Sequence, residues 1–330
     1  MSSPIQCIKK LAAISLCIST VLMVPLSIAQ ADDSGALAVH KALPQGKLLG
    51  NIDRLDPNKK PSENFELLDW HLTLPTDSDK NGKADSIPEV NLASKFEYSP
   101  LFYTAKDGGL VFAAPNKGAT TSKNTKYTRT ELREMLRKGN GRIKTQGVNK
   151  NNWVFGSMHS SGQRKAGAVD GSLEATVAVN RVSTTGDIKK VGRVIIGQIH
   201  AIKDEPIRLY YRKLPGNEKG AVYFAHEING GDDMWTNMVG TRSHTLANPE
   251  DGIALGELFS YKISVEKDLL VVTLIREGKP NITKTLDMSK SGYHLSNQYM
   301  YFKLGVYNQN NTGDDGDFVQ ATFYHFDNTH

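Results

Sequence analysis

Short runs of alternating apolar and polar residues dominate the chain from about residue 64 to its C-terminus. Residues 173–179, 259–265 and 319–326 alternate in this way, and residues 269–275 form a continuous apolar run that fits a fully buried strand or a short helix. Alternation with a period of two predicts β-strands, whereas long amphipathic helical patterns are scarce. Gly, Asn and Asp clusters between the runs indicate turns. The pattern predicts an all-β fold, an antiparallel β-sandwich of the jelly-roll type.

The first 31 residues have the features of a secretory signal peptide. Lys9 and Lys10 precede an apolar stretch from Leu11 to Ile28, and Ala29-Gln30-Ala31 gives an A-x-A cleavage pattern. A retained membrane anchor is less consistent with Pro25 and the short apolar core. We therefore expect a secreted or periplasmic protein that has no membrane attachment after cleavage. The expected organisation is a signal peptide over 1–31, a linker or N-terminal extension over 32–63 and one catalytic domain over 64–330.

Both cysteines, Cys7 and Cys17, lie in the predicted signal peptide. The exported chain would therefore have no disulfide, thiolate metal site or cysteine nucleophile. Cleavage also removes two lysines, so the formal net charge falls from +5 to +3. A weakly basic total does not indicate nucleic-acid binding, and charge matters here only where it is clustered.

Three segments cluster polar side chains on single strand faces: Arg129–Arg133, Gln198–His200 and Tyr301–Gln309. Because side chains on a strand point alternately to opposite faces, one face of each segment is polar while Leu132, Ile199, Phe302, Leu304 and Val306 turn toward a core. Alone, each segment could be a solvated strand face with cross-strand ion pairs. In one sheet, they would form a basic, aromatic surface suited to an extended acidic polymer. The polar faces carry Arg129, Glu131, Arg133, Gln198, His200, Tyr301, Lys303, Tyr307 and Gln309.

In order and spacing, these three segments resemble the three motifs of the alginate lyases in polysaccharide lyase family 7. The resemblance runs from about Asp69 to the C-terminus, and its one noted departure is Leu304, where the family often has Ala. Leu304 is expected to face the core, so this departure affects no catalytic residue. The resemblance implies a β-jelly roll whose concave sheet forms the substrate groove.

The resemblance also implies β-elimination on uronate polymers. Arg129 and Gln198 would bind the carboxylate and stabilise the charge that develops as C5 loses its proton. His200 would act as the base for guluronate, and Tyr307 would protonate the leaving oxygen, serving as both base and acid for mannuronate. Glu131 would orient the arginines. The implied catalytic residues are Arg129, Gln198, His200 and Tyr307, and the implied substrate-binding residues are Glu131, Arg133, Tyr301, Lys303, Asn308 and Gln309.

The expected function is therefore an endo-acting alginate lyase that needs no cofactor and no metal. Ile199, the middle residue of Gln198–His200, resembles the family members that accept guluronate. The expected partner is alginate, not nucleic acid, and the expected oligomeric state is a monomer. Two alternatives stay open from the sequence: a non-catalytic sandwich that binds acidic polysaccharides, and a lyase for another polyuronate such as glucuronan.

The segment Asp77–Asp85 resembles the start of a calcium loop because it has oxygen ligands at alternate positions and a glycine for the turn. Pro88 stands where an EF-hand has its bidentate glutamate. The sequence therefore favours a plain Asx-rich turn. A strand of the form Glu-x-Asp-x-x-Glu, typical of jelly-roll glucan hydrolases, is absent, which counts against hydrolysis by a carboxylate pair.

Overall fold

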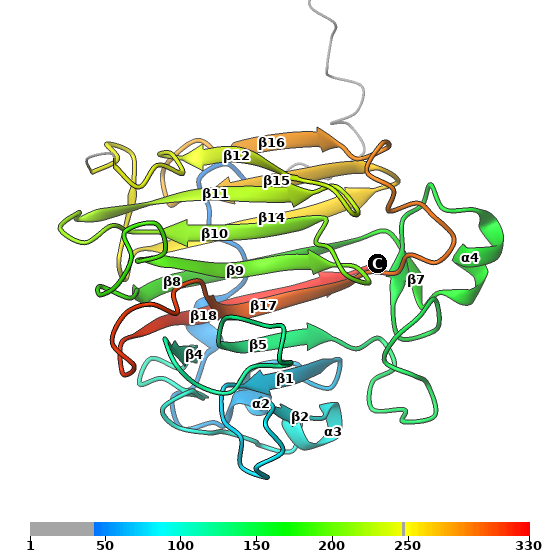
Figure 1. Ribbon diagram of the computed structural model, residues 1–330, viewed down its shortest axis with the longest axis horizontal. Coiled ribbons are helices and arrows are strands. Elements are labelled where there is room, and N and C mark those ends of the chain that lie inside the picture. Colours follow the sequence, from blue (N-terminus) through cyan, green and yellow to red (C-terminus); the bar gives the residue numbers. More distant parts are fainter. Residues whose placement is uncertain (1–42, 246–247) are drawn as a thin grey trace, which may run out of the picture. The chain divides into compact units, whose positions relative to one another are not determined.

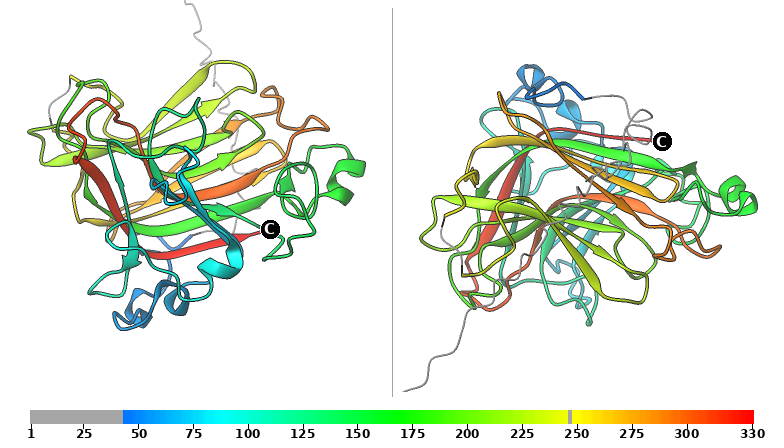
Figure 2. Two further views of the ribbon diagram at one scale, coloured as in Figure 1. Left: turned by 60° about the horizontal axis from the view of Figure 1, so that its bottom comes forward. Right: turned by 90° about the horizontal axis from the view of Figure 1, so that it is seen from above.

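The computed structural model describes residues 43–245 and 248–330, and the compact unit runs from Pro44 to His330. Within this unit two antiparallel sheets pack face to face (Figures 1 and 2). The predicted signal peptide and its cleavage site lie outside the described residues. Among the described helices, none has the length and apolar character needed to cross a membrane.

One sheet has nine strands and carries the three polar segments. Its order is β12-β11-β10-β9-β17-β5-β1-β2, and the short β13 pairs with β11 off this path. The bounds are β1 (Trp70–Leu74), β2 (Asp85–Ile87), β5 (Arg129–Glu134), β9 (Arg193–His200), β10 (Ile207–Arg212), β11 (Lys219–Glu227), β12 (Asp233–Val239), β13 (Ile253–Ala254) and β17 (Tyr301–Asn308).

The other sheet has seven strands in the order β16-β15-β14-β8-β18-β4-β3. Its bounds are β3 (Phe102–Thr104), β4 (Leu110–Pro115), β8 (Gly171–Arg181), β14 (Leu258–Glu266), β15 (Leu269–Ile275), β16 (Ile282–Asp287) and β18 (Phe318–Thr329). A separate parallel pair joins β6 (Trp153–Val154) and β7 (Ala168–Val169). The short helices are η1 (Ile52–Arg54), α2 (Pro61–Asn64), α3 (Glu89–Leu92) and α4 (Ser160–Lys165).

The apolar side chains of the two sheets form one continuous core. Leu132 and Phe302 from the nine-stranded sheet join Val177 and Phe323 from the seven-stranded sheet in one buried cluster. The continuous apolar run at 269–275 is strand β15, which β14 and β16 flank on both sides. The predicted all-β jelly-roll class is therefore confirmed, and the strand parity sends the polar residues of the three segments to the opposite face.

Residues 44–63, which the sequence assigned to a linker, pack on the seven-stranded sheet. The backbone N–H of Leu49 donates to Ser260 Oγ at 2.9 Å, and its carbonyl accepts a bond from Thr176 Oγ1 at 2.7 Å. Gly46 N–H donates to Asn281 Oδ1 at 3.1 Å. The segment shows no apolar periodicity, and it is attached both by these polar contacts and by Leu55, which joins the core.

Candidate active site

The three polar segments are neighbouring strands, as predicted, with β17 between β9 and β5. The register places Tyr301 opposite His200, Tyr307 opposite Arg129, and Lys303 between Gln198 and Arg133. Gly305 in β17 has φ +130°, and a Cβ there would lie 2.5 Å from Thr130 O. Next to it the β17–β9 register shifts between Leu304 and Tyr307, so a local irregularity sits at the centre of the site.

These strands form the floor of an open pocket of about 690 Å³. Loops supply its walls: Tyr127 precedes β5, Gln146 follows it, and Lys203 and Glu205 lie in the connection from β9 to β10. From the predicted set, the pocket is lined by Arg129, Arg133, His200, Tyr301, Lys303 and Tyr307.

Glu131 organises the floor from below. It is 2% exposed, forms ion pairs with Arg129 (Nη1 to Oε2, 3.0 Å) and Lys303, and accepts a hydrogen bond from Gln198 Nε2. Burial raises its pKa, but the charges of Lys303 and Arg129 outweigh burial, so its pKa is lowered overall. Burial and the neighbouring Arg129 lower the pKa of Lys303 to about 8. The predicted orienting role of Glu131 fits these contacts, which fix an arginine, a lysine and an amide together.

His200 is held in one tautomer. A carbonyl oxygen only accepts, so the 2.6 Å contact between His200 Nδ1 and Ala201 O places a proton on Nδ1 and leaves Nε2 as the basic nitrogen of the neutral ring. Burial, followed by the charge of Lys303, lowers the pKa of His200 to about 3. The ring also stacks on Tyr301, with centroids 5.1 Å apart. His200 is therefore neutral near pH 7, as a general base must be.

Glu205 is a functional candidate that sequence reasoning missed. Its Oε1 lies 3.2 Å from His200 Nε2, and its Oε2 lies 3.8 Å from Arg208 Nε. Burial, together with the hydrogen bond to Glu227, outweighs the attraction of Arg208 and raises the pKa of Glu205 to about 8. Glu205 Oε1 therefore lies beside the nitrogen of His200 that carries no proton in this tautomer. Glu205 stands in a loop without periodic pattern, so only three-dimensional proximity reveals it.

Tyr307 packs against a cation. Arg129 Cζ lies 3.6 Å from the centroid of its ring, and Tyr127 contacts it edge-on at 6.2 Å. Burial raises the pKa of Tyr307, and the charge of Arg129 offsets this only in part. The phenol therefore carries its proton near neutral pH and can donate it.

Arg133 and Tyr301, the two remaining pocket residues from the prediction, pack against each other. Arg133 donates from Nη2 to Thr145 O at 2.7 Å and to Asn152 Oδ1 at 3.2 Å, and its Cζ lies 3.9 Å from the Tyr301 ring centroid. A guanidinium fixed in this way is positioned for a second carboxylate.

Besides Glu131, three predicted residues do not line the pocket. Gln198 is 1% exposed and lies in the floor beside Glu131. Asn308 is fully buried and donates to Ala114 O and Asn116 Oδ1 at 3.3 and 3.0 Å, because its parity turns it toward β4. Gln309 is buried and donates to Asn308 O. The substrate-binding prediction for Asn308 and Gln309 is thus corrected to a structural role.

The Asp77–Asp85 segment has its carboxylates engaged within the loop. Asp77 accepts bonds from the backbone N–H groups of Asn81 and Gly82, and Asp85 accepts from Ser78 and Thr76. This is the geometry of an Asx-rich turn. Within the described ranges, no group of three or more His, Cys, Asp or Glu side chains has the arrangement of a metal site.

This basic pocket lies on one sheet of a jelly roll and has stacked aromatic rings, a neutral histidine on β9 and a protonated tyrosine on the adjacent β17. These are the groups that a polysaccharide lyase uses for proton transfer. The comparisons with known proteins specify the class further. The family model described as alginate lyase matches residues 65–330, and the chain belongs to this family. It is an alginate lyase, a carbon–oxygen lyase acting on a polysaccharide.

Relatives support this assignment at two levels of similarity. The alginate lyase of Klebsiella pneumoniae is 58% identical over 279 residues, which cover 82% of this chain and 91% of that protein. Comparison with the crystal structure of that enzyme gives a TM-score of 0.81, and the match covers 82% of this chain and 98% of the crystallised chain. The family 7 alginate lyase A1-II′, solved with a product written GGG, is 25% identical with a TM-score of 0.59, and the match covers 82% of this chain and 99% of that one.

Proposed function

We propose that this lyase cuts alginate by β-elimination within the chain and accepts guluronate, with Arg129, Gln198, His200 and Tyr307 as the catalytic residues. The observation that carries the proposal is the placement of a neutral imidazole and a protonated phenol on adjacent strands, β9 and β17, beside Arg129. These are the three kinds of group that the reaction needs: a base, an acid and a cation for the carboxylate.

The reaction starts with the uronate carboxylate. A proton on C5 is a poor acid while the neighbouring carboxylate keeps its full charge, so cationic and hydrogen-bonding groups must stabilise the charge that develops there. Arg129 lines the pocket and is held by Glu131. Gln198 uses one amide hydrogen for Glu131, and its amide group has a second to offer.

Proton transfer then follows the stereochemistry of the sugar. The base takes the C5 proton, the C5–H electron pair forms the C4=C5 double bond, the C4–O bond breaks, and the acid protonates the departing oxygen. In guluronate the C5 proton and the leaving oxygen lie on opposite sides, so His200 is the base and Tyr307 the acid. In mannuronate they lie on the same side, and Tyr307 serves both steps once it has lost its proton: the phenolate, stabilised by the charge of Arg129, takes the C5 proton and then gives it to the departing oxygen.

Acceptance of guluronate is supported by two observations. Ile199 lies between Gln198 and His200 in the sequence. Its side chain is fully buried and packs in the core beneath the pocket floor. Two structures of the relative A1-II′ are complexes with a product written GGG and a substrate written GGMG. Cutting within the chain is supported by the open pocket, which extends over the four neighbouring strands β1, β5, β17 and β9.

The test is the initial rate of unsaturated product formation on separate polyguluronate, polymannuronate and glucuronan, with product sizes followed over time. We expect cleavage of guluronate-containing substrate and early products of many lengths. Strict polymannuronate specificity would overturn the guluronate proposal. Release of a single small product from the start would overturn the proposal of cutting within the chain. Faster cleavage of glucuronan than of either alginate homopolymer would show that the main substrate is another polyuronate.

We also propose export to the periplasm or the medium and a monomeric state. The A-x-A pattern before Asp32 supports export, and the absence of cysteine after residue 17 suits a chain that leaves the cytoplasm. Mass spectrometry of the exported protein should give an N-terminus at or near Asp32. A chain that retains Met1 would contradict the cleavage.

A further inference from the structure

A pair of arginines lies on the nine-stranded sheet beyond the catalytic pocket. Arg193 in β9 and Arg212 in β10 are direct cross-strand partners, on the face that also carries Ile195 and Tyr210. Like charges directly opposite each other on neighbouring strands destabilise a sheet. This arrangement therefore costs the free protein stability unless an anion compensates it.

Neither arginine has an acidic partner in the described part of the chain. Arg193 Nη2 donates to Gln309 O at 3.3 Å, and Arg212 Nη2 donates to Ile188 O at 2.5 Å. The Nε atoms of both guanidiniums are buried and unpaired, and Arg212 as a whole is only 5% exposed. Backbone carbonyls thus fix the direction of both groups without neutralising their charge.

Aromatic rings and a third arginine adjoin this pair. Tyr210 and Tyr223 stack with ring centroids 5.2 Å apart, Trp235 lies 5.9 Å from Tyr223, and Arg242 Cζ lies 3.9 Å from the Trp235 ring centroid. The hydroxyl of Tyr223 is buried without a partner. Burial raises the pKa of Tyr223, and the positive charges of Arg193, Arg212 and Arg242 lower it, which shows that all three cations act on this hydroxyl.

The cluster lies on a direct line from the catalytic tyrosine. Tyr307 pairs with Ile195, Ile195 with Tyr210, and Tyr210 with Tyr223, so Tyr223 is three strands away from Tyr307. Neighbouring strands are about 4.8 Å apart, which gives a separation of about 14 Å. A polymer that continues from the catalytic pocket across β9 and β10 reaches the cluster within a few sugar units.

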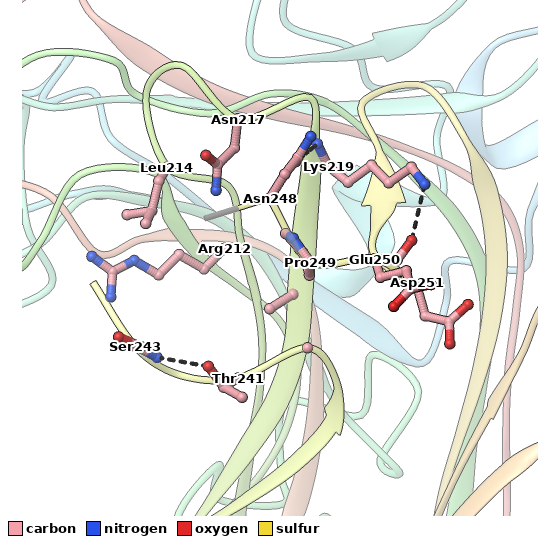
Figure 3. Close-up of a pocket in the computed structure, with 12 residues that line it drawn as sticks. Arg212, Leu214, Asn217, Lys219, Thr241, Ser243, Asn248, Pro249, Glu250 and Asp251 are labelled. Atoms are coloured by element: carbon pink, nitrogen blue, oxygen red, sulfur yellow. Dashed lines mark hydrogen bonds between the residues drawn. The ribbon is translucent and has the colours of Figure 1, made fainter. Parts of the chain in front are cut away.

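The surface beside the cluster is hollowed. Arg212 lines a pocket of about 310 Å³ together with Lys219, Thr241 and Ser243 (Figure 3). Figure 3 shows the Arg212 guanidinium directed away from Lys219, whose ammonium group donates to Glu250 O at 3.0 Å. The hollow therefore lies next to Arg212, whose own side chain stays buried.

We propose that Arg193 and Arg242, with the Trp235 ring, form a distal uronate subsite that binds a carboxylate of the alginate chain several units from the bond that is cut. The buried Arg212 adds its positive charge from within the sheet. The proposal rests on the proposed passage of an uncut chain through the catalytic pocket. Guanidinium forks match carboxylates in a bidentate way, and aromatic faces offer contact area to sugar rings. The bound carboxylate offsets the repulsion between Arg193 and Arg212.

The experiment compares Arg242→Gln and Arg212→Gln with a charge-matched control, Lys284→Gln, an exposed residue of β16 on the other sheet. KM and kcat are measured on polymer and on oligouronates short enough to occupy only the catalytic pocket. Loss of a charge-assisted bond that forms only with long chains should raise KM for polymer about tenfold, while KM for the short substrates changes far less. The control should behave as the wild type.

A thermal melt without substrate distinguishes binding from a structural role. Arg212→Gln relieves the cross-strand repulsion, so it should melt at a higher temperature than the wild type while binding polymer more weakly. A lower melting temperature with equal losses on short and long substrates would show that Arg212 is structural. Should Arg212→Gln not fold, the exposed Arg242→Gln decides alone. If both variants keep the wild-type ratio of KM for polymer to KM for short substrates, the subsite proposal is wrong. If the wild-type enzyme releases only single small products, the proposal of cutting within the chain is wrong instead.

Discussion

At the scale of single residues, His200 combines a fixed tautomer with a neutral ring. Replacing His200 with Ala removes the base at Nε2 but leaves Tyr307 and Arg129 in place. Positioned proton transfer is worth about 10² to 10⁴ in rate. We therefore expect guluronate cleavage to fall by that order and mannuronate cleavage to fall much less. Initial rates on both homopolymers check this, and equal losses on the two would contradict the separate role of His200.

Glu205 should affect stability with a definite sign. Its folded pKa of about 8 lies above the ordinary value of 4.5, so the folded state binds this proton more tightly than the unfolded state does. The contribution of Glu205 to the free energy of unfolding therefore falls as pH rises from about 4.5 to about 8. Glu205→Gln keeps a hydrogen-bond donor near His200 Nε2 and cannot ionise.

The measurement for Glu205 is the melting temperature of wild type and Glu205→Gln across this pH range. The variant should gain stability relative to the wild type as the pH rises toward about 8. His200 contributes in the other direction in both proteins, because its lowered pKa favours the folded state above about pH 6.5 and that stability is lost as pH falls toward about 3. A constant difference between the two proteins would show that Glu205 is ionised at neutral pH.

At the scale of elements, β17 depends on one glycine. Gly305→Ala places a Cβ 2.5 Å from Thr130 O in a strand whose φ there is +130°. We expect a loss of about 1 to 3 kcal/mol or more in the free energy of unfolding, since both strain and a backbone clash oppose alanine. Gly278→Ala is the matched control, with φ +66° and nothing within 4 Å of the added Cβ. Denaturant unfolding of both variants checks this, and an equal loss in the two would show that the clash is relieved at little cost.

The strands that carry the site were predictable because their signal is local. The alternation in Arg129–Arg133 and Tyr301–Gln309 fixes which side chains share a face, and six residues of the predicted set do line the pocket. Parity also put Asn308 on the core face, and the substrate-binding role assigned to it ignored that signal. The sequence did not predict roles for Glu205, Arg208 and Arg212. Their roles depend on residues of neighbouring strands and loops, and these contacts appear only in the folded structure.

At the scale of the whole molecule, alternating runs separated by turns predict the β-sandwich class. They do not predict the residue at which the folded unit begins. Residues 44–63 attach through backbone and side-chain hydrogen bonds to the seven-stranded sheet, which leave no periodic trace in the sequence. A chain that begins at residue 64 should therefore melt at a lower temperature than one that begins at Pro44. Calorimetry of the two chains checks this, and identical melting temperatures would show that the segment adds no stability.

The central claim concerns Tyr307, because either uronate needs an acid at the glycosidic oxygen. Tyr307→Phe removes one hydroxyl and keeps the ring that contacts Arg129 and Tyr127. The direct measurement is the initial rate of unsaturated product formation by this variant on polyguluronate and polymannuronate, with a thermal melt to confirm folding. The account predicts a loss of at least about 10² on both substrates with the melting temperature largely kept. A folded variant with near-normal rates on either polymer would contradict it and place the acid elsewhere in the groove.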